Sequence, residues 1–269
     1  MRLKIYLKSQ TGKFSIPINY NYALGAALYR IFYESSPEFA EWLHERGYIA
    51  SDGRKIKMFT FSQLYGTHLE AKGRLIEGKG RCWFLFSSPF DQTIVENLVF
   101  GILMRNRIFI ANREVSAVLK IERIEKREEP KFSRKMRYKM LSPTVVSIVK
   151  EREGKLHEYY LRVDEEETEK QLVENLKKKY EIVYRRKYDG ELKIGYDKEY
   201  IKKRGGASKV SKLITIAEGK LEETRIRGFL CPVEIVADIE MQKVAYECGL
   251  GKKNGLGFGM LEVVNDLNR

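Results

Sequence analysis

Hydrophobic and polar positions in the first half of the chain alternate between strand patterns and helix patterns. In residues 2–7, RLKIYL, every second residue is apolar, which is typical of a half-buried strand, and a polar turn is expected at 10–13. The same reasoning predicts helices at 22–33, 37–46 and 92–104, and strands at 57–65, 81–87, 107–110 and 114–124. The predicted order is β-α-β-β-α-β with the first helix broken in two, as in a ferredoxin-like domain.

The break in the first helix falls at Ser35-Ser36-Pro37. The residue before a proline avoids helical backbone angles, whereas Pro37 fits the first turn of a new helix that Ser36 can cap. We therefore expect two helices that can fold back on each other.

The second half repeats this order less regularly. The charged run EKREEPK at 125–131 is a change in composition, so we predict two domains, 1–125 and 126–269. The later patterns predict a strand near 134–149, a helix at 165–180, strands near 181–186, 191–196 and 209–217, a long strand in IRGFLCPVEIVADI, a helix from Asp238 to Cys248 and a closing strand in FGMLEVV. The fold class is thus α+β: tandem ferredoxin-like (RRM-like) domains with antiparallel sheets.

The charge of the chain favours a polyanionic partner. With 50 Lys and Arg against 37 Asp and Glu, the 269 residues have a formal net charge of +13. Such a field attracts nucleic acid first and an anionic membrane surface second, although single lysines are more simply solvated surface residues. The N-terminus has no long apolar stretch and no signal-peptide pattern, so we expect a cytoplasmic protein. Three scattered cysteines, Cys82, Cys231 and Cys248, suggest neither a disulfide framework nor a zinc site.

Five glycines occur within positions 249–259, in CGLGKKNGLGFGML. The dinucleotide pattern GxGxxG fails at Asn254, and no phosphate-binding GxxxxGK[ST] string is present. Because a helix precedes the stretch, Gly249 suits its C-terminal cap, and capture of a phosphate by a helix N-terminus is excluded. Anion binding would have to use loop N–H groups with Lys252 and Lys253, the glycines letting a partner reach the backbone; an ordinary helix-to-strand turn is the alternative.

The glycines also carry a resemblance. Two Gly-apolar-Gly triplets, 249–251 and 257–259, are separated by five residues and stand before the last predicted strand. This pattern resembles the C-terminal signature of the RAMP superfamily, in particular the CRISPR-associated endoribonucleases that cut precursor CRISPR RNA within its repeats. The helix INYNYALGAALYRIF, the segment WLHE and the strand KMFTFS are also similar to this family, so the resemblance covers nearly the whole chain.

The resemblance implies RNA cleavage without a metal or another cofactor. Members of this family use a tyrosine on the first helix, a histidine soon after it and a lysine near the next strand, which here correspond to Tyr29, His44 and Lys57. Tyr33 lies one turn from Tyr29 and is an alternative. Lys55 is another, because the segment between His44 and the lysine is longer than usual for the family. The other histidines, His68 and His157, are the weaker candidates.

The chemistry explains these residue types. The 2′-hydroxyl of RNA can attack the adjacent phosphorus, which leaves a 2′,3′-cyclic phosphate and a 5′-hydroxyl. A histidine suits proton transfer near neutral pH, a lysine stabilises charge on the phosphate, and a tyrosine serves as a base or for positioning. Along one straight helix Tyr29 and His44 would be about 22 Å apart. The break at Pro37 removes this obstacle.

The resemblance implies CRISPR repeat RNA as the partner. The candidate RNA-binding residues are Lys252, Lys253, Gly249, Gly251, Gly257 and Gly259 of the glycine-rich stretch, Arg134, Lys135 and Arg137 on the first strand of the second half, and Arg225 and Arg227 before the long strand. Residues 135, 137 and 139 share one strand face and form a basic stripe. A complex with CRISPR interference subunits and a homodimer are left open, and no membrane partner is expected.

Two other readings stay open. A non-catalytic RAMP-type subunit that binds CRISPR RNA would lack the histidine, whereas His44 is present. A general RNA-binding module is the second; the chain has no RNP-type aromatic strand motif, which weighs against an RRM in particular.

Overall fold

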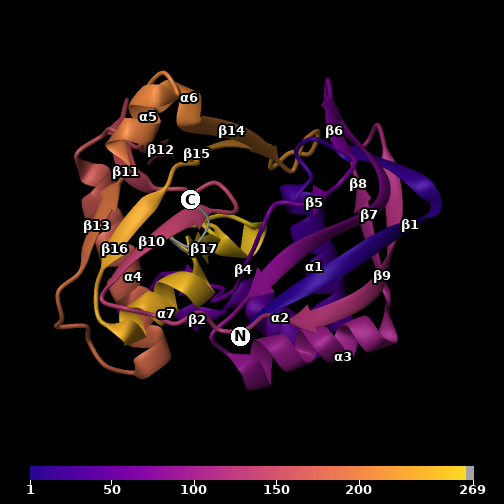
Figure 1. The fold of residues 1–269 in the computed structure, drawn as a ribbon, viewed down its shortest axis with the longest axis horizontal. Helices are drawn as coiled ribbons and strands as arrows, with labels where there is room; N and C mark the ends of the chain where they lie inside the picture. The colour runs from indigo at the N-terminus through magenta and orange to yellow at the C-terminus, as the bar shows by residue number, and fades with distance from the viewer. Residues whose placement is uncertain (265–269) are drawn as a thin grey trace.

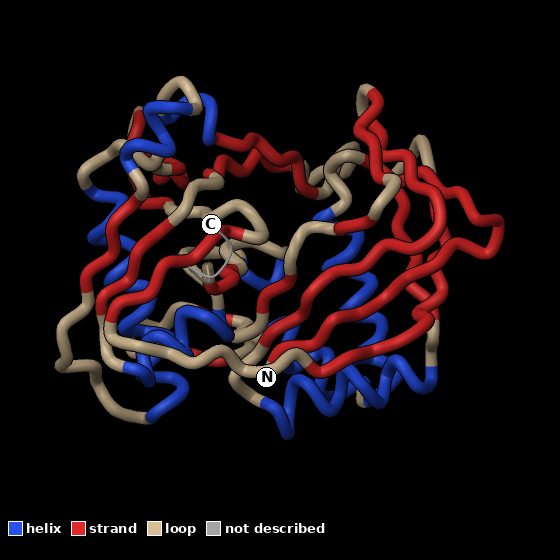
Figure 2. The backbone as a smooth tube through the Cα atoms, viewed as in Figure 1, coloured by secondary structure: helices blue, strands red, loops and turns tan. Residues whose placement is uncertain are grey.

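Two α+β halves lie side by side in the computed structural model, which describes residues 1–264 (Figure 1). Each half has an antiparallel sheet with helices packed on one face (Figure 2). The sheet of the N-terminal half ends at Lys126, and that of the C-terminal half begins at Lys135. The last five residues of the predicted domain 126–269 lie outside the described residues.

One seven-stranded sheet organises the N-terminal half. Its strands are β1 (Arg2–Pro17), β4 (Thr60–Phe61), β5 (Tyr65–Gly66), β6 (Leu69–Lys72), β7 (Leu75–Ser87), β8 (Arg107–Ala111) and β9 (Ser116–Lys126). β1 is central and pairs antiparallel with β7 on one side and β9 on the other. The order β4-β7-β1-β9 is that of a ferredoxin-like sheet, to which β8 adds an edge strand.

The helices of this half cover the face of the sheet that points to the core. They are α1 (Asn21–Ser35), α2 (Pro37–Glu45), one π-helical turn η1 (Asp91–Val95) and α3 (Glu96–Met104). Leu3, Ile5 and Leu7 of β1 are buried beneath them, as the alternating pattern predicts. A short hairpin, β2 (Tyr48–Ile49) with β3 (Lys55–Ile56), follows α2.

The C-terminal half has a four-stranded sheet in the order β13-β16-β10-β17. Its core elements are β10 (Lys135–Met140), α4 (Glu167–Tyr184), β13 (Lys193–Tyr196), β16 (Val233–Val236), α7 (Ile239–Cys248) and β17 (Leu261–Val263). The chain order β-α-β-β-α-β and the sheet order both match the ferredoxin-like topology. The predicted tandem ferredoxin-like fold is confirmed.

Insertions make the second half less regular in sequence. They are the hairpin β11 (Ser147–Arg152) with β12 (Lys155–Tyr160), the helices α5 (Lys198–Lys203) and α6 (Ala207–Val210), the hairpin β14 (Ser211–Ile216) with β15 (Thr224–Phe229), and a 3-10 turn η2 (Asn254–Leu256). The predicted strand at 134–149 is therefore two separate strands. The predicted long strand is likewise divided into two strands, β15 and β16. Pro232 lies between them, and proline has no N–H to donate to a neighbouring strand of a sheet.

Three further predictions of local structure are wrong. The predicted strand at 57–65 is two short strands, β4 and β5, with residues 62–64 between them. Residues 10–13 form no separate turn but lie within β1, where the pairing with β7 shifts register between Lys8 and Lys13. Residues 181–184 are the last turn of α4 instead of a strand. Ile182 is buried there, so packing against the core overrides the strand preference of a β-branched residue.

Hydrogen bonds connect the two halves. Thr60 of β4 donates to the carbonyl of Phe258 at 2.9 Å, and the Asn21 amide donates to the carbonyl of Gly257 at 3.4 Å. The buried guanidinium group of Arg2 donates to the carbonyl of Tyr246 at 2.6 Å and lies over its ring. The glycine-rich stretch is therefore part of the contact between the halves. Within residues 1–264, no helix has the length and apolar character needed to cross a membrane.

The contact of α1 with α3 can be tested at Gly101. A Cβ atom at this position would overlap the carbonyl oxygen of Ile31 in α1. Although alanine is favoured over glycine in a helix, we expect Gly101→Ala to lower the free energy of unfolding by about 1–3 kcal/mol, because the helices must separate. Gly195→Ala in β13, where an added Cβ meets no atom within 4 Å, is the control and should leave stability unchanged or slightly raised. Urea denaturation measures both, and equal effects would contradict the assignment.

Candidate active site

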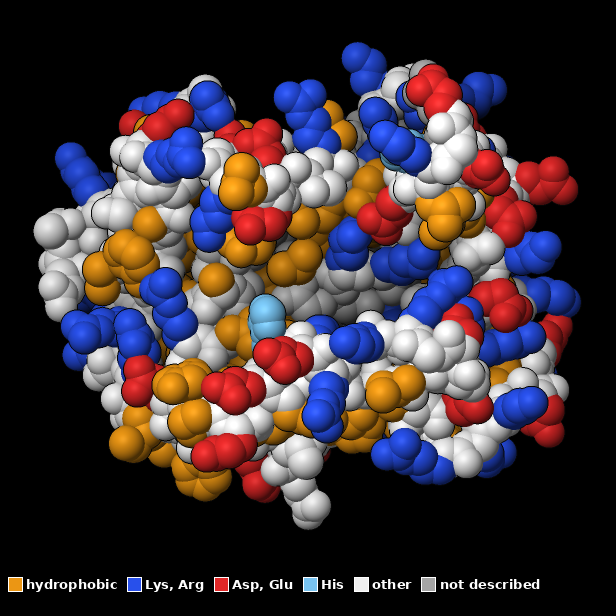
Figure 3. Space-filling view, turned by 180° about the vertical axis from the view of Figure 1, so that it is seen from behind, with side chains coloured by type: hydrophobic (Ala, Val, Ile, Leu, Met, Phe, Trp, Pro, Cys, Tyr) orange, Lys and Arg blue, Asp and Glu red, His pale blue; other side chains and the backbone are white. Residues whose placement is uncertain are grey.

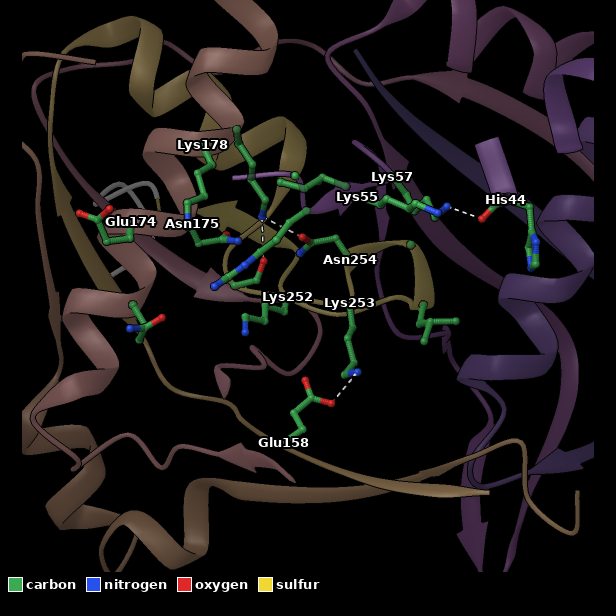
Figure 4. Close-up of a pocket in the computed structure, with 18 of the residues that line it drawn as sticks. His44, Lys55, Lys57, Glu158, Glu174, Asn175, Lys178, Lys252, Lys253 and Asn254 are labelled. Atoms are coloured by element: carbon green, nitrogen blue, oxygen red, sulfur yellow. Dashed lines mark hydrogen bonds and ion pairs between the residues drawn. The ribbon is translucent and has the colours of Figure 1, made fainter. Parts of the chain in front are cut away.

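A cleft of about 730 Å³ lies where the two halves meet. Figure 4 shows α2 with His44 on one side of it and α4 with Glu174, Asn175 and Lys178 on the other, with the glycine-rich loop between them. The molecule is hollowed near the middle of the face in Figure 3, where Lys and Arg side chains border the hollow. The cationic residues that line the cleft are Arg54, Lys55, Lys57, Lys178, Lys179, Lys252 and Lys253.

The helix break brings Tyr29 and His44 together. The Ser36 hydroxyl accepts a hydrogen bond from the Phe39 N–H at 3.1 Å and caps α2. The two rings meet edge to face, with their centroids 5.2 Å apart. Both residues line the cleft, and the His44 side chain is exposed. The fold thus provides the proximity that a straight helix would prevent.

Lys55 and Lys57 both donate hydrogen bonds to carbonyl groups at the C-terminal end of α2. The Lys57 ammonium donates to the carbonyl of Leu43 at 2.6 Å and to that of His44, and Lys55 donates to the carbonyl of Glu45 at 2.8 Å. The last carbonyl groups of a helix have no partner within it, so lysines placed there satisfy them. Burial and the neighbouring charge of Lys55 lower the pKa of Lys57. Both lysines line the cleft, and of the two only Lys57 bonds to the backbone carbonyl of His44.

The two tyrosines differ in their surroundings. Tyr29 packs against Phe32 and Phe59 as well as His44, and burial raises the pKa of its hydroxyl well above the ordinary value. Tyr33 is 53% exposed and does not line the cleft. The geometry favours Tyr29 as the residue with a role beside His44.

The other two histidines lie elsewhere. His68 is exposed in a turn beside β6 and lines a separate surface hollow. His157 is exposed on β12, opposite Lys150 in the hairpin. Neither lines the cleft.

The protein itself fills the space that the glycines leave. Gly249, Gly251, Gly255, Gly257 and Gly259 are all buried, and a Cβ at Gly257 or Gly259 would overlap Phe61 or the carbonyl of Leu250. Both have a positive φ, which disfavours other residues. The close neighbours of these glycines in this structure are therefore other parts of the chain, and a contact of their backbone with RNA stays a prediction. A Cβ at Gly255 would lie 3.2 Å from Cβ of Lys57, so the loop also supports the candidate site.

Lys252 and Lys253 do reach the cleft from this loop. Lys252 donates to the carbonyl of Ser147 at 2.7 Å, and Lys253 lies 3.1 Å from a carboxylate oxygen of Glu158. Burial, followed by the charge of Arg54, lowers the pKa of Lys252. A partly buried cation such as Lys252, whose hydrogen-bond partner is a neutral carbonyl, interacts strongly with an anion that replaces this partner.

Sequence reasoning missed Lys179. This residue of α4 is 1% exposed, and its ammonium donates to the carbonyls of Gly249 and Gly251 at 2.7 and 2.9 Å and to the Asn254 amide oxygen at 2.8 Å. Three acceptors match the three hydrogens of a charged lysine. A signal was available: Lys179 lies seven residues after Leu172 and three after Leu176, on the apolar face of the helix.

The remaining basic candidates lie outside the cleft. Lys135 and Arg137 share the exposed face of β10, as the alternation predicts, and form ion pairs with Glu234 and Asp197. Arg134 is 3.6 Å from Glu191. Arg225 and Arg227 are on β15, where Arg227 donates to the Ser211 hydroxyl at 3.3 Å. Their role in RNA binding stays a prediction.

No group of three or more His, Cys, Asp or Glu side chains within the described part of the chain is arranged to hold a metal ion. The three cysteines are free thiols and buried.

The fold and the cleft thus define a tandem ferredoxin-like protein with a cationic cleft between its halves. Residues 15–122 match the family profile "CRISPR-associated protein Cas6, N-terminal", and residues 126–263 match "CRISPR associated protein Cas6, C-terminal". The chain therefore belongs to the Cas6 family of CRISPR-associated proteins, and the resemblance read from the sequence is confirmed.

Individual relatives agree. The chain is 30% identical over 270 residues to a protein of Methanocaldococcus jannaschii described as "CRISPR-associated endoribonuclease Cas6 1", covering 99% of this chain and 95% of the relative. It is 28% identical over 256 residues to a Pyrococcus furiosus protein described as "CRISPR-associated endoribonuclease Cas6", covering 93% and 84%. A solved structure of a "CRISPR associated protein Cas6" superposes with a TM-score of 0.75 at 26% identity, covering 98% of this chain and 99% of that one.

The contacts of Lys179 predict a dependence of stability on pH. Burial lowers its pKa to about 7, whereas the pKa of a lysine in an unfolded chain is about 10.4. Between these values the unfolded chain binds one proton more, so this residue makes folding more favourable as pH rises from 7 to 10, by up to about 1.4 kcal/mol per pH unit. Below pH 7 Lys179 is charged in both the folded and the unfolded chain, so the full free-energy cost of burying its charge opposes folding.

Lys179→Met removes this titration and also leaves three acceptors without a donor, at about 1–3 kcal/mol each. We expect the variant to be less stable at every pH, and the gap to wild type to widen from pH 7 to 10. Lys177→Met, on the same helix and outside these contacts, is the control. Denaturant titrations at several pH values measure both, and a gap independent of pH would refute the lowered pKa.

Proposed function

We propose that this protein is an endoribonuclease that cuts precursor CRISPR RNA within its repeats, and that the RNA lies in the cleft between the halves. The observation that carries the proposal is the contact of Tyr29 with His44, 5.2 Å between centroids, beside Lys57 in a cleft lined by lysines and an arginine. The relatives' description as endoribonucleases supports it. Processing of a cellular transcript in this way would take place in the cytoplasm.

In the proposed reaction the 2′-oxygen attacks the adjacent phosphorus and the bond to the 5′-oxygen breaks. The proton of the 2′-hydroxyl leaves to a base, and the departing 5′-oxygen receives one, which gives a 2′,3′-cyclic phosphate and a 5′-hydroxyl. His44 is exposed at the cleft and is the proposed general acid for the 5′-oxygen. No step requires a metal ion.

Tyr29 and Lys57 take supporting roles in this proposal. Burial keeps the Tyr29 hydroxyl protonated, because its pKa is raised, so it donates a hydrogen bond to the substrate instead of accepting the 2′-proton. Lys57 fixes the end of α2 through the carbonyls of Leu43 and His44. Its charge at the cleft also stabilises negative charge that develops on the phosphate oxygens.

Lys252, Lys253 and Lys178 are the proposed contacts to flanking phosphates. Lys252 and Lys253 enter the cleft from the loop, and Lys178 enters it from α4 on the side away from His44 (Figure 4). Neutralising phosphates releases counterions from the RNA, so affinity should fall steeply as salt rises.

Substitution of His44 tests the reaction. With excess chelator present, the wild-type protein should cut a repeat-containing RNA but not the same RNA with a 2′-deoxy sugar at the scissile position. His44→Ala should lower the single-turnover rate constant by about 10²–10⁴-fold, because proton transfer is lost, while RNA affinity is retained. His68→Ala, outside the cleft, should cut at the wild-type rate.

Three outcomes would count against this proposal. Cutting of the 2′-deoxy RNA would contradict attack by the 2′-hydroxyl. Loss of activity in the presence of chelator would contradict a reaction without a metal ion. Tight binding of repeat RNA without any cutting would instead indicate a non-catalytic RNA-binding subunit.

The two tyrosines form a matched pair for a second test. Tyr29→Phe removes one hydroxyl in the cleft and should lower kcat about 10-fold, the effect of one lost hydrogen bond of about 1.4 kcal/mol, with little change in KM. Tyr33→Phe removes the exposed hydroxyl one helical turn away and should change neither. A larger effect of Tyr33→Phe would reverse the assignment.

A further inference from the structure

The wall of the cleft opposite His44 is a polar face of α4. Gln171, Glu174, Asn175 and Lys178 line the cleft, whereas Leu172 and Leu176 of the same helix are buried in the core. Gln171 and Asn175 are four residues apart, so their amides are neighbours on the helix surface. Figure 4 shows Asn175 beside Lys178 on the side of the cleft away from His44.

The Asn175 amide has no hydrogen-bond partner among residues 1–264. Its oxygen is buried and without a donor, although the side chain is only half-buried and borders the cleft. Gln171 uses one N–H, donated to the Glu167 carboxylate at 2.8 Å. Asn254, in the same cleft, is fully used: its oxygen accepts from Lys179, and its nitrogen donates to the carbonyls of Leu250 and Phe258.

A buried amide oxygen without a donor destabilises a folded protein, because it has lost its hydrogen bonds to water and gained none in return. A ligand that offers an N–H would remove this penalty, and rotation about χ2, which is broad for asparagine, can turn the oxygen toward the cleft. Phosphates offer only acceptors, and the lysines of the cleft suit them. A nucleobase offers N–H donors and acceptors on one edge, which match an amide.

We propose that Gln171 and Asn175 form a base-recognition site for an unpaired nucleotide next to the scissile phosphate. The site rests on the proposed function, since RNA must occupy the cleft. The cations hold the backbone, and the two α4 amides select the base. Sequence preference at this nucleotide then arises from hydrogen bonds to the base edge, independently of the chemistry at His44.

Asn175→Leu tests this proposal, because leucine has a similar size and no hydrogen-bonding group. RNAs are prepared in which each nucleotide flanking the cut is replaced in turn by the other three bases. Affinities are measured with His44→Ala, which keeps the RNA intact, and kcat/KM with the active protein. With Asn175 present, affinity and kcat/KM should differ between bases at one flanking position by about 5- to 150-fold. Asn175→Leu should reduce the difference at that position to a ratio near one and leave the base preferences at the other positions unchanged.

The melting temperature separates recognition from a structural role. Because the unpaired amide is removed, Asn175→Leu should melt at or above the wild-type temperature. Lys252→Ala is the control: it should weaken binding to all the RNAs alike and reduce the dependence of log Kd on log salt concentration. Gln171→Met, which keeps the length of the side chain, should also reduce discrimination.

Several results would overturn the proposal. One is that Asn175→Leu lowers the affinity for every RNA equally, and another is that it leaves the pattern of base preference unchanged. A third is that it lowers both the melting temperature and the activity on all the RNAs alike. If the active protein cuts none of the RNAs, the proposed function fails. The affinities with His44→Ala still decide whether α4 recognises a base.

Discussion

The arrangement of the site depends on three hydrogen bonds from one buried ammonium group. Lys179 of α4 binds the carbonyls of Gly249 and Gly251 and the amide of Asn254, and so fixes the glycine-rich loop against the C-terminal half. The loop in turn packs against Phe61 and Lys57 of the N-terminal half. The hydrogen bonds of the Lys179 ammonium to three acceptors reduce the cost of burying its charge. Removal of the Lys179 side chain would leave these acceptors in the loop without a donor.

Residues that hold the fold together are therefore also residues of the proposed site. Lys57 completes the C-terminal end of α2 and thereby places a positive charge beside His44. Ser36 caps the start of that helix, so both ends of a nine-residue helix are fixed by side chains. A short helix held in this way presents His44 to the cleft in a defined position, which its proposed role as general acid requires. The opposite wall, α4, combines the buried Lys179 with Asn175, whose amide oxygen has no donor among the described residues.

Much of the fold could be predicted from local patterns. The alternation in β1 and β10, the helical spacing in α4 and α7 and the break at Pro37 all have short-range physical causes, and each element begins close to its predicted start. The failures have long-range causes. Residues 181–184 follow the core packing of α4, and residues 10–13 remain in β1 because β7 pairs on both sides of the irregularity. The insertions β11–β12 and β14–β15 displaced the strand boundaries in the second half.

For the candidate site, the sequence by itself determined the residue types, the helix break and the family pattern of glycines. It left Tyr29 and Tyr33, and Lys55 and Lys57, as alternatives, because neighbours on one helix or strand cannot be separated by spacing. Only the tertiary structure decided that Tyr29 contacts His44, that the glycines pack against the protein's own chain, and that Lys179 holds the loop. These decisions depend on contacts between segments up to about two hundred residues apart, which local propensity does not encode.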